Sequence, residues 1–177
     1  METLVFTPKE IRAGADGRTV AGVAVPYGQT AIGTKGTETV VPGAFTRTLQ
    51  HWRDSGRRLK LYRSHDHGAP VGVIELVEDT PGGLLIEARM ADTNAGDEAL
   101  REVLAGMLDS FSIGFTAKRE AMVAGIRELR EVALHEVSLV ALPAYDGAVV
   151  TEVRDAPKVD LSRYMPPDLP RDVADWC

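Results

Sequence analysis

Short runs of β-branched and other apolar residues, separated by turns rich in Gly, Pro and Asp, recur along most of the chain and constrain its fold more than any other feature. They predict strands over residues 18–27, 38–41, 58–64, 71–78, 84–90, 111–119, 125–132, 134–142 and 147–154. Residues 79–83, Asp-Thr-Pro-Gly-Gly, have the chemistry of a tight turn and predict that the strands on either side form a hairpin. Residues 28–39, rich in Gly and Thr, predict a surface loop.

Two segments have helical spacing of their apolar residues instead. Residues 44–53 are followed by Asp-Ser-Gly, which predicts that a short helix ends there. Thr93 or Asn94 can cap a second helix, whose apolar residues lie on one face as far as Met107. The pattern therefore predicts an α+β chain that is mainly β, with a curled or closed sheet and helices packed outside it.

The composition allows one hydrophobic core of ordinary size. The chain has 177 residues, of which 44% are hydrophobic and 26% charged, which is typical of a single globular domain. Residues 155–177 contain four prolines and few aliphatic residues, so a regular element of any length is excluded there. We expect one domain over residues 1–154 and a Pro-rich, disordered or docking tail over residues 155–177.

Charge and cysteine content exclude several classes of function. The net charge is −6 with both signs interspersed, which argues against nucleic acid as a partner. Cys177 is the only cysteine, so one chain can form neither a disulfide nor a cysteine-based zinc site. This cysteine content is compatible with a protein that works in a reducing cytoplasm. No apolar run reaches about 18 residues and the start lacks a secretion signal, so we expect neither export nor a membrane span.

The segment Ser64-His65-Asp66-His67-Gly68 is the first candidate for chemistry, because it lies where a strand is predicted to end. A side chain at such a point is held rigidly and still reaches a cleft. Two histidines two positions apart at a strand end point to the same side, with Asp66 between them, so a metal site is one hypothesis. His51 and His135 are the only other histidines, and no spaced carboxylate motif accompanies them, which disfavours metal.

The second candidate is the segment of residues 109–115. The two-residue period of a strand places Ser110, Ser112 and Gly114 on one face, with large apolar residues on the other. A serine beside a glycine lies where another chain can approach closely. The same pattern also fits a plain strand with small residues under a packed helix.

The third candidate is Glu136, within the strongly β-forming residues 134–140. A carboxylate inside such an apolar strand needs a partner, because burying it unpaired is costly. That partner is either an arginine across a hairpin, such as Arg127 or Arg130, or an imidazole. The three candidates together supply a hydroxyl, an imidazole and a carboxylate, which nucleophilic acyl transfer requires. Spacing alone does not show that they converge, and a β-rich domain without catalysis stays open.

The order of these segments resembles the prohead protease family of tailed bacteriophages, the capsid-maturation serine proteases related to herpesvirus assemblin. The resemblance extends from about residue 22 to residue 154. The matching pieces are GVAVPY at 22–27, VPGAF at 41–45, SHD at 64–66 with PVG at 70–72, FSIGF at 111–115, and EVSLV at 136–140 with PA at 143–144. Each piece is short, but their shared order and spacing make the signal specific.

The resemblance implies a serine endopeptidase in which His65 is the general base, Ser112 the nucleophile and Glu136 the residue that orients His65. Herpesvirus relatives have a second histidine in the third role, and His135 would face the opposite way from Glu136 on a strand. The implied fold is an assemblin-like, closed or strongly curled antiparallel β-barrel surrounded by a few helices. A homo-oligomer is implied, with no cofactor and no metal, and the turn at residues 143–145 is a candidate oxyanion site.

The resemblance also implies what the enzyme cleaves and where. Its substrates would be the scaffolding protein or the scaffolding segment of the major capsid protein, cut inside the immature procapsid in the host cytoplasm. In this family the protease often cleaves itself as well. Two alternatives stay open: a non-enzymatic capsid- or scaffold-associated module with the same fold, and a metal-dependent hydrolase that uses His65, Asp66 and His67.

Overall fold

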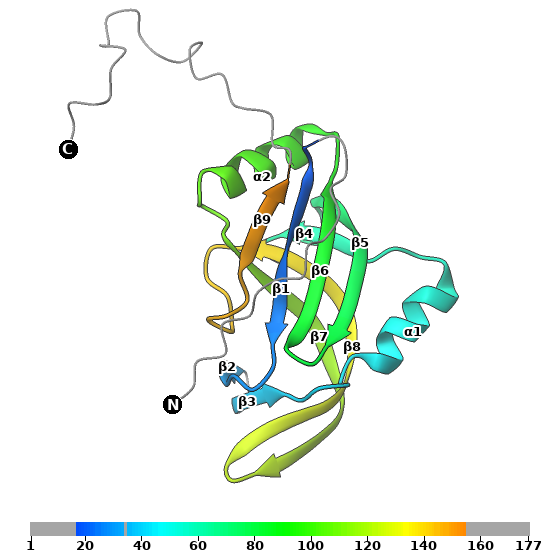
Figure 1. The fold of residues 1–177 in the computed structure, drawn as a ribbon, viewed down its shortest axis with the longest axis vertical. Helices are drawn as coiled ribbons and strands as arrows, with labels where there is room; N and C mark the ends of the chain where they lie inside the picture. Colours follow the sequence, from blue (N-terminus) through cyan, green and yellow to red (C-terminus); the bar gives the residue numbers. More distant parts are fainter. Residues whose placement is uncertain (1–16, 34, 155–177) are drawn as a thin grey trace, which may run out of the picture.

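The structure, a computed structural model, describes residues 17–33 and 35–154 (Figure 1). Its elements are β1 (Thr19–Pro26), β2 (Ala31–Gly33), β3 (Gly36–Val40), α1 (Thr46–Ser55), β4 (Lys60–Arg63), β5 (Pro70–Thr80), β6 (Gly83–Met90), α2 (Asn94–Leu104), β7 (Ser110–Val123), β8 (Ile126–Val140) and β9 (Val150–Arg154). The prediction of a mainly β, α+β chain with two helices is confirmed. The predicted hairpin at residues 79–83 is also present, as the antiparallel pair β5–β6.

All the strands belong to one sheet, in the order β2-β3-β8-β4-β5-β6-β1-β9, with β7 paired to β8. Along one edge β8 pairs with β7 antiparallel, and its other edge is shared by β3 and β4. Both β3 and β4 run parallel to β8, with Glu38 opposite Arg127 and Leu61 opposite Val137. The expectation of an antiparallel sheet is therefore wrong at this point. The physical reason is that β3 and β4, connected through α1, follow each other in the same direction along β8.

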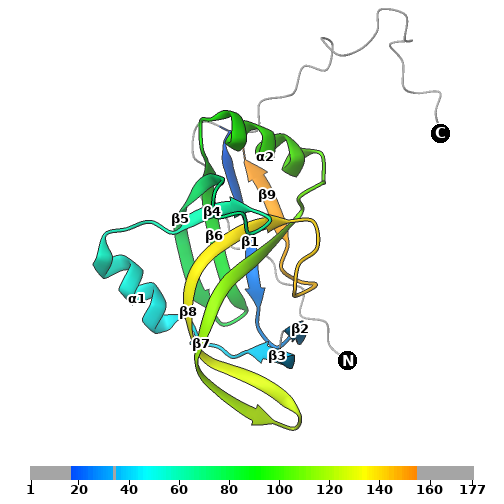
Figure 2. The same ribbon diagram turned by 180° about the vertical axis from the view of Figure 1, so that it is seen from behind.

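Seen from behind, β7 and β8 cross in front of β1, β5 and β6 (Figure 2). The two sides meet through residues 148–150: the Val149 carbonyl accepts from the Val23 N–H at 3.1 Å, and the Phe111 N–H donates to the Ala148 carbonyl at 2.9 Å. Ser110 and Val149 form an isolated bridge and not a ladder. The strand ladders do not close the sheet into a barrel, so the barrel part of the expectation is not confirmed.

One hydrophobic core lies between these layers. Its largest fully buried side chains come from β1, β3, β4, β6, β7, β8 and the residue just before α1: Val20, Val25, Val40, Phe45, Leu61, Leu84, Ile86, Met90, Phe111, Leu129, Leu134 and Leu139. The helix α1 is fixed to β8, because the Trp52 indole N–H donates to the Leu134 carbonyl at 3.0 Å and the Leu134 N–H donates to Thr48 Oγ1 at the same distance. These two bonds satisfy backbone groups of β8 that would otherwise be buried unpaired.

Two boundary predictions are wrong for identifiable reasons. The predicted strands 125–132 and 134–142 are one strand, β8, because irregularities in its pairing with β7 shift the alternation without ending the strand. The predicted loop 28–39 contains β2 and most of β3, which pair with each other. The predicted tail of residues 155–177 lies outside the described residues. Within the described part of the chain, no helix is long and apolar enough to cross a membrane.

Candidate active site

The chain turns sharply directly after β4, at Ser64 and His65. Their φ angles are 50° and 61°, in the left-handed region that only a few per cent of non-glycine residues adopt. The Asp66 N–H donates to the Arg63 carbonyl at 3.0 Å, so residues 63–66 form a β-turn with both central residues left-handed. Backbone strain of about 1–3 kcal/mol per residue persists only where surrounding interactions fix the conformation, and it concentrates at functional sites.

This turn brings His65 to Glu136 on β8. Their side chains approach to 2.6 Å between Nδ1 and Oε1. The Glu136 side chain is only 3% exposed, whereas the His65 side chain is 45% exposed. Because a carboxylate only accepts, Nδ1 carries the proton of this contact, and in the neutral imidazole the opposite ring nitrogen, Nε2, keeps a free lone pair. The pair thus consists of a buried carboxylate and a half-exposed imidazole that, when neutral, can accept a proton at Nε2.

A third residue, Ser138, connects the two. Its Oγ donates to Glu136 Oε2 at 2.8 Å and accepts from the His65 backbone N–H at 3.1 Å. Ser138 is fully buried. The sequence placed Ser138 on the same face of its strand as Glu136, but nothing in the pattern indicated that it would also bind the His65 turn, which comes from a part of the chain 73 residues away.

Ser112 lies on β7 directly opposite Ser138 in the antiparallel ladder. Directly opposite residues project to the same face, so Ser112 shares a face with Ser138 and Glu136. Ser112 is half-buried, and among the described residues its side chain makes no hydrogen bond. The structure therefore joins His65 to Glu136 directly and places Ser112 on the neighbouring strand, without a bond to His65. On the other face of β8, His135 is exposed and its Nε2 lies 2.8 Å from Thr116 Oγ1.

Gly114 gives the Glu136 carboxylate its space. The two residues are opposite each other in the β7–β8 ladder. A Cβ added at Gly114 would lie 2.5 Å from Glu136 Oε1 and 2.9 Å from its Cγ. The space at Gly114 is therefore occupied by the carboxylate that contacts His65, and the expected approach of another chain at this serine and glycine stays a prediction.

The arginines considered as partners of Glu136 are engaged elsewhere. Arg127 Nη1 lies 2.5 Å from Glu38 Oε2, and its guanidinium also donates to Glu120. Arg130 pairs with Glu128 at 2.8 Å. The hydrogen bond from Arg127 lowers the pKa of the Glu120 carboxyl. Of the two kinds of partner considered for Glu136, the imidazole is the one present.

The residues of the metal hypothesis do not converge. Asp66 Oδ1 accepts from the Gly68 N–H at 2.9 Å and thereby stabilises the next turn. The His67 ring lies 5.1 Å from the Tyr62 ring, whereas His65 faces Glu136. Because β4 ends at Arg63, the expected strand geometry with both histidines on one side is not formed. Over residues 17–33 and 35–154, no group of three His, Cys, Asp or Glu side chains could hold a metal ion.

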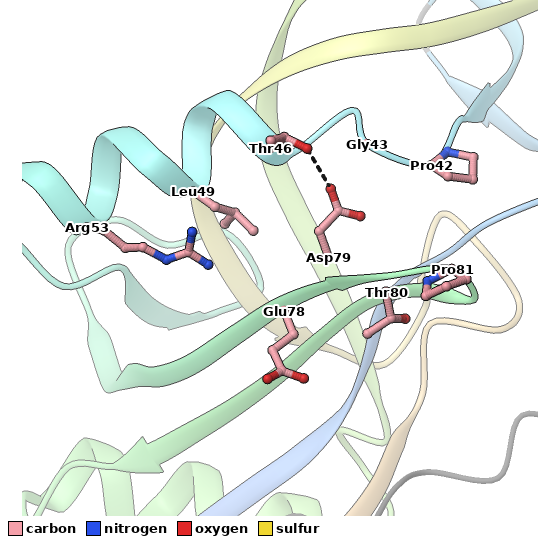
Figure 3. A pocket seen from close by; sticks show the side chains of 9 residues that line it. All are labelled: Pro42, Gly43, Thr46, Leu49, Arg53, Glu78, Asp79, Thr80 and Pro81. Atoms are coloured by element: carbon pink, nitrogen blue, oxygen red, sulfur yellow. Dashed lines mark hydrogen bonds between the residues drawn. The ribbon is translucent and has the colours of Figure 1, made fainter.

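A hollow of about 710 Å³ lies elsewhere, between α1 and the turn from β5 to β6 (Figure 3). Thr46, Leu49 and Arg53 line it from the helix, and Asp79 lies across from them. The Asp79 carboxylate is held there by the Tyr27 hydroxyl at 2.6 Å and by Thr46 Oγ1 at 3.4 Å. None of His65, Ser112 and Glu136 lines this hollow.

The turn at residues 143–145, the candidate oxyanion site, leads into a buried tyrosine. Tyr145 is 4% exposed, and its hydroxyl has no hydrogen-bond partner among the described residues. Burial, with a smaller contribution from the Glu38 charge, raises the pKa of Tyr145 to about 12. Its carbonyl accepts from the Ala148 N–H at 2.9 Å, which orders the loop that precedes β9.

The sequence profile of the family described as caudovirus prohead serine protease matches residues 7–160. A comparison with curated proteins gave no match.

Among solved structures, the Kaposi's sarcoma-associated herpesvirus protease in complex with a hexapeptide phosphonate inhibitor is similar to this chain, with a TM-score of 0.54 and 17% identity. The similarity covers 76% of this chain and 64% of that one. The varicella-zoster virus protease is 16% identical, with a TM-score of 0.46 over 75% of this chain and 62% of that chain. This chain therefore spans less than two thirds of the length of either of these two solved chains. At such identities, the likeness to the Kaposi's sarcoma-associated herpesvirus protease shows a shared fold.

Proposed function

Because the chain belongs to the caudovirus prohead serine protease family, we propose that it is a serine endopeptidase in which Ser112 is the nucleophile, His65 the general base and Glu136 the residue that orients His65. The observation that carries this proposal is the 2.6 Å contact between His65 Nδ1 and the buried Glu136 carboxylate. A buried acceptor at Nδ1 fixes the imidazole tautomer and stabilises the imidazolium that forms when Nε2 takes a proton.

The proposed reaction proceeds through an acyl-enzyme. Ser112 Oγ attacks the carbonyl carbon of the scissile peptide while His65 Nε2 takes its proton, which gives a tetrahedral intermediate. Collapse of the intermediate breaks the C–N bond, and the imidazolium gives the proton to the leaving amine. Water, deprotonated by His65, then hydrolyses the ester and restores the Ser112 hydroxyl. Backbone N–H donors at the oxyanion would contribute about 10²–10³ in rate each, and the turn at residues 143–145 is our candidate for them.

The absence of a Ser112–His65 hydrogen bond is compatible with this role. In enzymes without substrate, catalytic hydrogen bonds are often long and shorten only in the complex. Two features favour an approach of the Ser112 hydroxyl to the His65 ring: Ser112 lies opposite Ser138, and the Ser138 hydroxyl accepts from the His65 backbone N–H. The half-buried Ser112 hydroxyl also has no competing bond among the described residues.

We further propose that the substrates are the scaffolding protein or the scaffolding segment of the major capsid protein, together with this chain itself. Cleavage would take place inside the immature procapsid, in the host cytoplasm, and the active form would be a homo-oligomer. The catalytic domain would comprise residues 1–154, and residues 155–177 would be a tail available for removal or docking. Family membership supports a role in procapsid maturation.

The test is coexpression of the full chain with the capsid and scaffolding proteins of the same phage or phage-derived element. We expect truncated products, with termini defined by mass spectrometry, from the wild type and none from Ser112→Ala or His65→Ala. Ser110→Ala is the matched control, because it removes a hydroxyl from the same strand and face, one that within residues 17–33 and 35–154 bonds only to Asp109. A fluorophosphonate probe should label the wild type and Ser110→Ala but not Ser112→Ala.

Processing by Ser112→Ala at the wild-type rate would refute the proposal. A wild type that neither cleaves nor reacts with the probe would instead favour the non-enzymatic capsid-associated module. A wild-type activity lost on chelation and restored by a divalent metal would favour the metal-dependent hydrolase.

A further inference from the structure

Three hydrogen bonds at the candidate site form a closed ring that contains one residue without a role in the proposed reaction. The ring runs from the His65 backbone N–H to Ser138 Oγ, from that hydroxyl to Glu136 Oε2, and from Glu136 Oε1 back to His65 Nδ1. The distances are 3.1, 2.8 and 2.6 Å. Ser138 is therefore bonded to both the backbone of the histidine and the carboxylate that contacts its ring.

The first function of such a ring concerns the carboxylate. A glutamate side chain has three rotatable bonds, and a carboxylate bonded through one oxygen alone can rotate about the last of them. With Oε2 held by Ser138, Oε1 is directed to His65 Nδ1. Glu136 is 3% exposed and Ser138 fully buried, so water does not compete for either oxygen. Loss of the hydroxyl would leave Oε2 buried without its donor, which favours another rotamer.

The second function concerns the turn that carries the imidazole. Ser64 and His65 both have left-handed φ angles, and a strained turn keeps its conformation only through the bonds around it. Two of these bonds come from β8: the Ser64 N–H donates to the Leu139 carbonyl at 2.9 Å, and the His65 N–H donates to Ser138 Oγ. Only the second depends on a side chain, so a substitution at position 138 can release it.

We propose that Ser138 is a positioning residue, which fixes the distance and tautomer of the His65–Glu136 pair by holding both partners at once. The inference rests on the proposed function, because it assumes that this pair acts in catalysis. It predicts that without Ser138 the distance and tautomer of the His65–Glu136 contact are no longer fixed, although the β8 strand and the core stay intact.

The experiment compares Ser138→Ala with Thr48→Val in the full chain. Thr48 Oγ1 is also buried and also accepts from an N–H of β8, that of Leu134, but it does not touch His65 or Glu136. Nitrogen-15 NMR of the imidazoles, with His65 assigned by His65→Gln, reports the tautomer without any need for activity. We expect wild type and Thr48→Val to show a single His65 tautomer with a protected Nδ1–H, and Ser138→Ala to show a mixture of tautomers.

Kinetics gives the second readout. We expect kcat for substrate cleavage to fall about 10²-fold in Ser138→Ala with KM unchanged, since a misplacement of about 1 Å costs that much. Thr48→Val should lose stability to urea comparably and keep its kcat. Ser138→Cys, which is slightly larger than serine and keeps a weak donor, should give an intermediate kcat, and it is the variant to test if Ser138→Ala does not fold.

Two results would overturn the inference: a single protected Nδ1–H tautomer with kcat within threefold of wild type in Ser138→Ala, or the same tautomer mixture in Thr48→Val. Failure of the proposed function is separable from both. If Ser112→Ala still cleaves, the proposed catalytic roles are wrong, whereas the tautomer comparison still decides whether Ser138 holds His65 and Glu136 together.

Discussion

Gly114→Ala is a direct test of whether the Glu136 carboxylate must occupy its observed place. The added Cβ would lie 2.5 Å from Glu136 Oε1, and an ordinary contact begins at 3.4 Å, so the carboxylate or the strand must move by about 0.9 Å. The carboxylate cannot move freely, because its two oxygens are 2.6 Å from His65 Nδ1 and 2.8 Å from Ser138 Oγ. If the carboxylate moves by that amount away from either partner, the bond to that partner is stretched to the limit of the hydrogen-bonding range or past it.

The expected cost follows from that geometry. A buried hydrogen bond to a charged group contributes about 1.5–3 kcal/mol, so the unfolding free energy of Gly114→Ala should fall by about 2 kcal/mol. A displacement near 1 Å in the catalytic geometry should lower kcat about 10²-fold. The free energy is measured by urea denaturation and kcat by cleavage of the coexpressed or purified capsid substrate.

Gly33→Ala is the matched control for this prediction. A Cβ at Gly33 would also lie within 2.5–2.7 Å of a carboxylate, that of Glu38, which pairs with Arg127 far from His65 in the fold. Neither glycine has a positive φ, so both substitutions test space alone. We expect Gly33→Ala to lose stability and keep its kcat. If folded Gly114→Ala cleaves within threefold of wild type, the assignment of Glu136 as the orienting residue is wrong.

Two further predictions concern stability. Tyr145→Phe removes a buried hydroxyl without a partner among the described residues, so we expect the unfolding free energy to rise by about 1 kcal/mol, measured in urea at pH 7. Burial raises the pKa of Tyr145 from 10.0 to about 12, so the stability advantage of the variant over wild type should grow as the pH rises from 10 to 12. A stability difference that does not change with pH would mean that the hydroxyl is solvated. Glu120→Gln should be less stable than wild type above the ordinary glutamate pKa of 4.5, because the bond from Arg127 lowers the pKa of Glu120. The difference in urea midpoint should vanish as the pH falls through that lowered pKa, and a difference that persists in acid would contradict the reasoning.

Local patterns were sufficient for much of the secondary structure. Apolar runs bounded by turn residues predicted β1, β5 and β6 to within a few residues, turn chemistry predicted the β5–β6 hairpin, and the two-residue alternation described the first half of β7. The same alternation correctly placed Glu136 and Ser138 on the face opposite His135. It did not predict that β3 and β4 run parallel to β8, because alternation defines the two faces of a strand and carries no information about which strand lies beside it or in which direction.

The sequence by itself determined which residue types are available for chemistry: a serine beside a glycine on one strand, a carboxylate within an apolar strand, and a histidine after a strand end. Only the tertiary structure decided between an arginine and an imidazole as the partner of Glu136, and only it brought Ser138 to the His65 turn. The left-handed conformation of Ser64 and His65 also had no local signal, since no glycine marks it. These contacts join residues more than 70 positions apart, and such contacts depend on how the strands assemble, which short-range patterns do not specify.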